Sequence, residues 1–247
     1  MTKTPSRADT AYQALRQAII EQALPPGTRL PEDVIGKEFA MSRTLARSTL
    51  ARLQAEGLIE AGRKRTATVA RPSLEEAKED FEVRRALERE AIRLVIARWK
   101  PQFGALLEGH VREEDHAKAR HDARVSIRLA GEFHIRLAEM SGNRLLQRYL
   151  SEVVSRCSLI LALYGRPHSS ECAVNEHREI IEALRHGDAD AATALMDHHI
   201  GSVEQRALIG ERESELDLGS VLSRYATDIE RSSGGTPLAA RRKAVTR

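Results

Sequence analysis

The stretch that decides the fold is SRTLARSTLARLQAEG, residues 42–57. Ser42 predicts an N-cap, because its side-chain oxygen can accept a hydrogen bond from a free backbone amide of the first turn. Gly57 predicts the end of the helix, where a left-handed residue commonly closes the last turn. The apolar residues fall at helical spacing i, i+4, i+7 and predict one buried face: Ala46, Leu50 and Leu53.

The opposite face of this predicted helix carries the chemistry. Arg43 and Arg47 form one i, i+4 pair, and Thr44 and Ser48 form another, so the first turns present guanidinium and hydroxyl groups together. Arginine forks match the O6 and N7 acceptors of guanine, and hydroxyls contact phosphates or bases. The alternative is a pair of solvated helix charges. The flanking elements favour the reading of DNA.

Those flanking elements complete a winged helix-turn-helix. A helix over about residues 10–22 ends before Pro25-Pro26-Gly27, and a second helix is predicted over about 32–39. After the third helix, short strands at 58–60 and 67–70 enclose a turn that carries Arg63, Lys64 and Arg65. Basic residues in such a wing can enter the minor groove or neutralise phosphates. We therefore predict a DNA-binding domain over residues 1–72.

The charge distribution agrees with this division. Residues 1–71 carry twelve Lys and Arg against seven Asp and Glu, whereas residues 72–229 carry 22 against 28. A basic head on an acidic body indicates that the head meets a polyanion, although ordinary surface variation would also produce such a difference.

The rest of the chain reads as helices only. Ser73 and Glu76 form a predicted capping box, which opens a helix that runs to Trp99. Further helices are predicted over about 102–120, 122–141, 143–164, 171–186 and 188–210, separated by Gly, Asn and Pro. The fold class is therefore mainly α: a winged helix-turn-helix, then an all-helical ligand-sensing bundle over 73–225. A basic tail, 226–247, is expected to be disordered.

The composition excludes several other classes. No stretch approaches the roughly 20 consecutive apolar residues of a membrane helix, and residues 1–9 lack the apolar run of a secretory signal. Two cysteines, Cys157 and Cys172, are too few for a disulfide framework and favour a reducing cytoplasm. We expect a cytoplasmic protein without a membrane partner.

The N-terminal part resembles the GntR family of bacterial regulators. The resemblance lies in PGTRL at 26–30, SRT at 42–44, Arg47, Leu50 and LQAEGLI at 53–59. Where the family usually reads Pro-Val-Arg-Glu-Ala-Leu, this chain has LARSTL at 45–50, so the Pro and the Glu are lost. The resemblance implies contact with operator DNA through Arg29, Ser42, Arg43, Thr44 and Arg47. The wing departs from the family, which often has Arg-Gly there, and its basic residues Arg63, Lys64 and Arg65 are also expected to contact DNA.

The helical part resembles the C-terminal FCD domain of the FadR subfamily. The matching segments are EVRRALE at 82–88, EFH at 132–134, SGN at 141–143, EHREII at 176–181 and GDA at 187–189, leading to Met196 and His199. The resemblance implies a divalent metal, Zn²⁺ or Ni²⁺, held by one Asp and three His, here His134, His177 and His199. Ala130 stands where the Asp is expected, so one ligand is missing.

The other histidines are expected at the surface. His110, His116 and His121 lie in a run with Glu113, Glu114 and Asp115, which predicts a solvated face, and His198 is also predicted to be exposed.

An organic-acid effector would need a cation in the same pocket. Arg84 stands where the subfamily often places such an arginine, and a bidentate contact to a carboxylate is a natural role for it. The alternative is a surface ion pair with Glu88 at i+4.

Together these features predict a homodimeric DNA-binding regulator, more commonly a repressor, that a small carboxylate controls. Two other functions stay open at this point. One is a metal-dependent hydrolase that uses the three histidines, which would need an open ligand position and a nearby general base. The other is an architectural DNA-binding protein whose helical body only dimerises.

Overall fold

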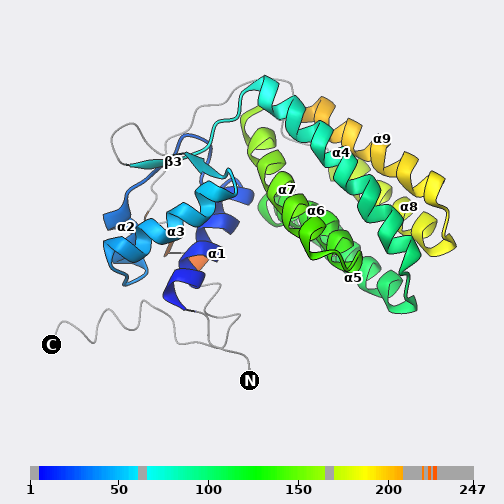
Figure 1. Ribbon diagram of the computed structural model, residues 1–247, viewed down its shortest axis with the longest axis horizontal. Coiled ribbons are helices and arrows are strands. Elements are labelled where there is room, and N and C mark those ends of the chain that lie inside the picture. The colour runs from blue at the N-terminus through cyan, green and yellow to red at the C-terminus, as the bar shows by residue number, and fades with distance from the viewer. Residues whose placement is uncertain are drawn as a thin grey trace. The chain divides into compact units, whose positions relative to one another are not determined.

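A computed structural model describes residues 6–60, 66–164 and 170–207, together with 219, 222, 223, 225 and 226. The chain divides into two compact units, one formed by residues 1–71 and 213–247 and the other by residues 72–212 (Figure 1).

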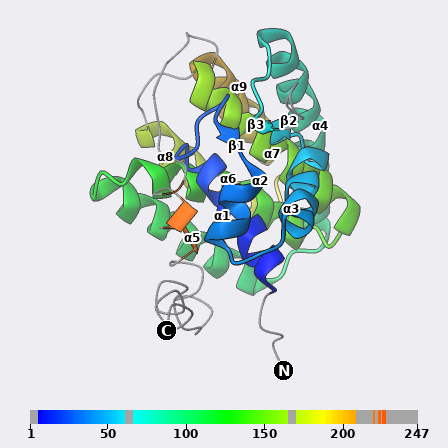
Figure 2. The ribbon, with the colours of Figure 1, turned by 90° about the vertical axis from the view of Figure 1, so that its left-hand side faces the viewer.

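The described part of the N-terminal unit is a small winged-helix fold (Figure 2). Its elements are α1 (Arg7–Ile20), β1 (Arg29–Leu30), α2 (Glu32–Glu38), α3 (Arg43–Ala55), β2 (Ile59–Glu60) and β3 (Ala67–Val69). The strands form an antiparallel sheet in the order β1-β3-β2, in which Arg29 pairs with Thr68 and Ile59 pairs with Val69. The helices and the hairpin lie within a few residues of their predicted positions. The two-residue strand β1 was not predicted.

Helix α3 has the boundaries that its sequence predicts. The Ser42 side chain accepts a hydrogen bond from the Leu45 amide, and Gly57 takes φ +70° just after the helix. Ala46, Leu50 and Leu53 are buried, so the predicted apolar stripe faces the core. This orientation leaves the arginine-bearing side of α3 outside the core.

A short C-terminal piece belongs to this same unit. Leu222, Tyr225 and Ala226 are buried, and the Tyr225 hydroxyl donates a hydrogen bond to the buried carboxylate of Glu21 at the end of α1. The helical bundle was expected to extend to residue 225, but the described residues 219, 222, 223, 225 and 226 group with the N-terminal unit. Most of the predicted tail, 226–247, lies outside the described residues.

We expect Tyr225→Phe to lower the free energy of unfolding by about 1–3 kcal/mol, because a buried carboxylate loses a hydrogen-bond donor. Urea unfolding of the full chain measures the change. Ser48→Ala is the control, since it removes an exposed hydroxyl from the same unit. Equal stability of the two variants would show that the C-terminal contact contributes nothing.

The second unit is all-helical in its described residues. It contains α4 (Leu74–Ala97), α5 (Pro101–Ala119), α6 (Ala123–Met140), α7 (Arg144–Tyr164), α8 (Ser170–His186) and α9 (Ala189–Ala207). The predicted capping box opens α4: Ser73 accepts from the Glu76 amide, and Glu76 accepts from the Ser73 amide. All six helices begin and end within a few residues of their predicted positions.

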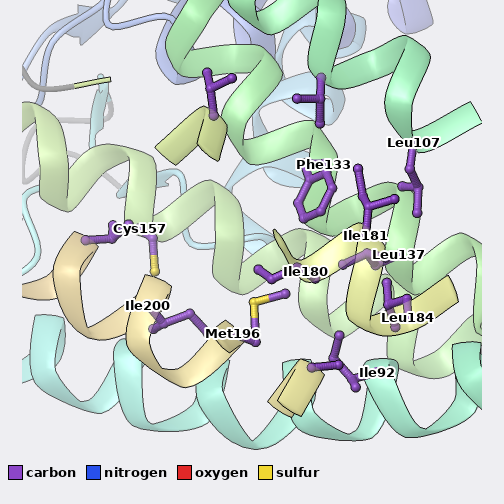
Figure 3. Packing of buried hydrophobic residues seen from close by; sticks show 14 of the residues in the cluster. Ile92, Leu107, Phe133, Leu137, Cys157, Ile180, Ile181, Leu184, Met196 and Ile200 are labelled. Atoms are coloured by element: carbon purple, nitrogen blue, oxygen red, sulfur yellow. The ribbon is translucent and has the colours of Figure 1, made fainter. Parts of the chain in front are cut away.

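One hydrophobic core joins these helices (Figure 3). Each of the six contributes side chains, among them Ile92, Leu107, Phe133, Cys157, Ile180 and Met196. Polar side chains, among them His134, His177 and His199, lie buried within the same bundle. Among the described residues, no helix combines the length and the apolar character that crossing a bilayer requires.

Candidate nucleic-acid interface and metal centre

The predicted DNA-reading face of α3 is open to solvent within its unit. Ser42, Arg43, Thr44 and Ser48 are exposed, and the Arg47 side chain is 69% exposed. Arg29, on β1, is exposed as well. These side chains are therefore available to a duplex. The wing residues Arg63, Lys64 and Arg65 lie outside the described residues.

Arg47 is not free in the absence of DNA. Its Nε and one terminal nitrogen donate to the two carboxylate oxygens of Glu32, both at 2.8 Å. These hydrogen bonds hold the pKa of the Glu32 carboxyl below its ordinary value. Glu32 opens α2, so the fork links the two helices of the helix-turn-helix. DNA phosphates or guanine would have to compete with this carboxylate for Arg47.

We expect Glu32→Gln to strengthen binding to non-specific DNA several-fold, because one negative charge beside the phosphates is removed and Arg47 is released. The plot of log affinity against log salt concentration should become steeper by about 0.9, the change that one additional phosphate contact produces. Fluorescence anisotropy on a random duplex across a salt series measures both effects. Glu38→Gln, on the same helix, changes the charge equally. Identical behaviour of the two variants would show that Glu32 does not restrain Arg47.

A second set of contacts fixes α3 against α1. Arg52 of α3 donates to Asp9 at 2.9 Å, and its guanidinium lies 4.0 Å from the centre of the Tyr12 ring. The Tyr12 hydroxyl in turn donates to Glu56, just beyond the end of α3. Burial, followed by this contact with Glu56, raises the pKa of Tyr12 to about 12, so the phenol remains a donor. These contacts therefore hold the C-terminal part of α3 against α1.

The three predicted histidine ligands converge in the helical unit. His134 comes from α6, His177 from α8 and His199 from α9, and each side chain is buried. One ligand atom of each lies within 4.8 Å of the other two, and the Nε2 atoms of His134 and His199 are 3.2 Å apart. The Phe133 ring stacks on His177, with ring centres 4.0 Å apart. Residues distant in sequence thus form one cluster, as predicted.

Each imidazole has a carboxylate at Nδ1. Glu114 lies 2.9 Å from Nδ1 of His177, and Glu176 lies 2.6 Å from Nδ1 of His199. Glu88 lies 2.7 Å from Nδ1 of His134, although the alignment falls short of a hydrogen bond. A carboxylate can only accept, so it favours the tautomer that carries its proton on Nδ1. The Nε2 lone pairs are then left to face the middle of the cluster.

Such an arrangement fits a divalent metal. The Nε2 atoms of His134 and His199 are 3.2 Å apart, a distance that suits either a hydrogen bond between the rings or two ligands of one ion, and Nε2 of His177 is buried without a hydrogen-bond partner. Tetrahedral Zn²⁺ with Zn–N bonds of 2.0–2.1 Å separates its ligand nitrogens by about 3.3 Å. Metal-binding histidines characteristically carry a carboxylate on the other ring nitrogen. His134, His177 and His199 would therefore hold the ion.

The protonation states of His134 and His199 are compatible with metal binding. Burial, together with the nearby charges of Arg84 and His177, holds the pKa of His134 well below its ordinary value, and burial does the same for His199. Both imidazoles therefore stay neutral, which is the form that binds a metal. Burial raises the pKa of Glu88 to about 7, against the opposing effect of Arg84.

Arg84 lies beside this cluster rather than at the surface. Its side chain is 5% exposed, and its Nε donates to Glu88 at 3.3 Å. The predicted ion pair with Glu88 therefore exists, but it is buried. Arg84 also lies close enough to His134 and His199 to lower the pKa of both. A buried guanidinium next to a candidate metal site can receive an anion.

The surface assignment of His110 was wrong. His110 is buried, and its Nε2 lies 2.8 Å from the Leu129 carbonyl oxygen, to which it donates. Glu114, one turn along α5, is fully buried and contacts His177, so it also does not lie on a solvated face. The i, i+4 spacing of His110 and Glu114 was the available signal. His116, His121 and His198 are exposed, as predicted.

Glu176 is a further residue that the sequence did not identify. It directly precedes His177 on α8, and adjacent residues of a helix point in different directions. It does point away from His177, but it reaches His199 on the neighbouring helix. Glu132, the other acidic neighbour, pairs with Arg128 at 2.8 Å.

Comparisons with known proteins define the class. A sequence model of the gntR family of bacterial regulatory proteins matches residues 7–69, and a model of the FCD domain matches residues 79–202. The HTH-type transcriptional regulator YdhC of Bacillus subtilis is 28% identical over 73% of this chain and 82% of its own. The HTH-type transcriptional repressor RspR of Escherichia coli is 22% identical over 78% of this chain and 86% of its own.

Solved structures share the fold. E. coli McbR/YncC superposes with a TM-score of 0.73 at 19% identity, over 80% of this chain and 95% of that one. A putative GntR regulator from Rhodococcus sp. RHA1 gives 0.71 at 23% identity, over 82% and 98%.

The chain belongs to the gntR family of bacterial regulatory proteins, with an FCD domain as its helical part. It is therefore a DNA-binding transcriptional regulator and not an enzyme. The alternative of a metal-dependent hydrolase finds no support in its relatives, which are named as regulators.

Proposed function

We propose that this regulator binds its operator through the exposed face of α3 and that a divalent metal and a small carboxylate in the helical unit control this binding. The observation that carries the proposal is the convergence of three buried imidazoles beside a buried arginine. Buried clusters of titratable groups with shifted pKa values are concentrated at functional sites, which supports a ligand here. Because its target is DNA, we place the protein in the cytoplasm.

We further propose that the protein acts as a homodimer, since two reading helices one DNA turn apart would match a palindromic operator. Exposed apolar side chains support an interface on the helical unit. Leu145 and Tyr149 are 54% and 44% exposed one turn apart on α7, and Val83 of α4 is 49% exposed. Light scattering of the full chain tests the dimer, and a monomer at working concentrations would contradict it.

Repression relieved by the effector is the polarity that we propose, and the similarity to a repressor, RspR, supports it. The test is anisotropy with the protein's own upstream DNA, using chelator-treated protein, then adding Zn²⁺ or Ni²⁺, and then a panel of carboxylates. We expect at least one combination to lower operator affinity. If operator affinity is the same under every condition, the regulatory role of the helical unit is rejected.

A further inference from the structure

A short C-terminal piece of the chain is anchored on the DNA-binding unit. Leu222, Tyr225 and Ala226 have the spacing i, i+3, i+4 of one helical stripe, and each is at most 2% exposed. The Tyr225 hydroxyl donates a hydrogen bond to Glu21 at the end of α1, in the same unit (Figure 1). The residues that follow Ala226 therefore continue from the unit that binds DNA.

The sequence after this anchor is basic. Residues 227–247 carry five Lys and Arg against two Asp and Glu, and residues 231–247 contain no acidic residue. Four of the basic residues lie within seven positions, residues 241–247, which we call the basic segment: Arg241, Arg242, Lys243 and Arg247. A dense run of positive charge is typical of segments that bind the phosphates of a nucleic acid.

The chain between the anchor and the basic segment is long enough to reach DNA on this unit. Arg241 lies 15 residues after Ala226, and 15 residues span up to ~50 Å when fully extended. Helices α1 and α3 have 14 and 13 residues, which makes each about 20 Å long. Contacts of Arg52 with Asp9 and Tyr12 hold these two helices together. Phosphates beside the reading helix therefore fall within reach of the basic segment.

The competing anion is the acidic helical unit of the chain itself. Several of its accessible carboxylates already have an arginine partner: Asp197 with Arg89, Asp115 with Arg178, and Glu108 with Arg185. Duplex DNA instead presents one negative charge per ~1.7 Å of its axis and releases condensed counterions when cations bind. DNA is therefore the stronger partner for the basic segment.

We propose that the basic segment contacts the phosphate backbone of the DNA to which the winged helix binds. Phosphate contacts carry no sequence information, so the segment adds affinity for every duplex and leaves sequence discrimination unchanged. The anchor at Tyr225 keeps the segment on the DNA-binding unit, which raises its effective concentration beside the duplex. This role requires only that the protein binds DNA, and it does not depend on the metal or the effector.

The experiment compares the full chain with the tail variant, Arg241→Gln/Arg242→Gln/Lys243→Gln. Fluorescence anisotropy with a random duplex and with the protein's own upstream DNA, across a salt series, measures the affinity and its salt dependence. We expect the tail variant to bind both duplexes more weakly by the same factor. The slope of log affinity against log salt concentration should become shallower by about 0.9 for each phosphate contact that is lost, and by roughly 2.7 if all three are lost.

The control variant removes three exposed charges from the helical unit: Arg120→Gln/Arg124→Gln/Arg144→Gln. It has the same net charge as the tail variant and should keep the slope of the wild type. An unchanged slope in the tail variant would overturn the proposal. An equal loss of slope in both variants would also overturn it, because net charge then explains the change. Tighter DNA binding by the tail variant would show instead that the basic segment pairs with the acidic helical unit.

The two duplexes separate this role from that of the reading helix. Arg43 and Arg47 are proposed to contribute to the difference in affinity between operator and random DNA, whereas the basic segment contributes equally to both. If the tail variant loses affinity for the upstream DNA alone, the phosphate contacts are rejected and the proposed role of α3 is unaffected.

Discussion

Replacing both Arg43 and Arg47 with alanine is expected to reduce the affinity for the operator to the level of non-specific DNA. Both side chains are exposed on the first turns of α3, where they can reach base edges in the major groove. A bidentate arginine–guanine pair contributes about 1–3 kcal/mol of discrimination, so two such pairs would account for much of the specificity. Anisotropy with the operator and with a scrambled duplex, at one salt concentration, measures the loss.

The control removes the same charge elsewhere. Arg93 and Arg112 are each 65% exposed on helices of the other unit, and the double alanine variant at these positions should retain specific binding. Operator affinity that is undiminished in the Arg43/Arg47 variant would reject α3 as the reading helix. If the two double variants lose operator affinity equally, the change in net charge explains the loss and α3 has no specific role.

The second large effect concerns the histidine cluster. We expect His177→Ala or His199→Ala to remove the increase in melting temperature that Zn²⁺ or Ni²⁺ produces in chelator-treated protein. A ligand present at 100 times its dissociation constant stabilises the folded state by about 2.7 kcal/mol, and a variant that lacks one of three ligands loses most of that gain. Differential scanning fluorimetry with a metal series measures the shift.

His198 provides a close control for this prediction. It is adjacent to His199 on α9 but exposed, so His198→Ala should keep the full metal-induced shift. Equal shifts in the wild type, His177→Ala and His199→Ala would remove the metal site from the account. If His198→Ala loses the metal-induced shift together with His177→Ala and His199→Ala, the metal binds at the surface and not in the buried cluster.

The helices were predictable because their signals are local. The Ser42 cap, the capping box at Ser73 and the glycine after α3 each act over only a few residues, and the structure contains all three. The three histidines could be grouped only through their resemblance to a family, because α6, α8 and α9 carry them on separate helices. Strand β1 escaped prediction because two residues show no periodicity and it forms only by pairing with β3.

The features that could not be predicted from the sequence depend on contacts between residues far apart in the chain. Glu114 and His177 are 63 residues apart, and an acidic run on α5 looks the same whether one member is buried or all are solvated. Likewise, Tyr225 and Glu21 are separated by 204 residues, so nothing local places the C-terminal piece on the N-terminal unit. Burial in these places follows from tertiary packing, which side-chain spacing alone does not reveal.

In the proposed mode of operator recognition, arginines of α3 read guanine in the major groove. Methylation interference at guanine N7 tests this claim directly, because the N7 atom accepts one of the two hydrogen bonds of an arginine fork. We predict that methylated guanines in the operator weaken binding by the wild type and have no further effect on the Arg43→Ala/Arg47→Ala variant. Equal sensitivity of both proteins to the same methylated guanines would contradict the account.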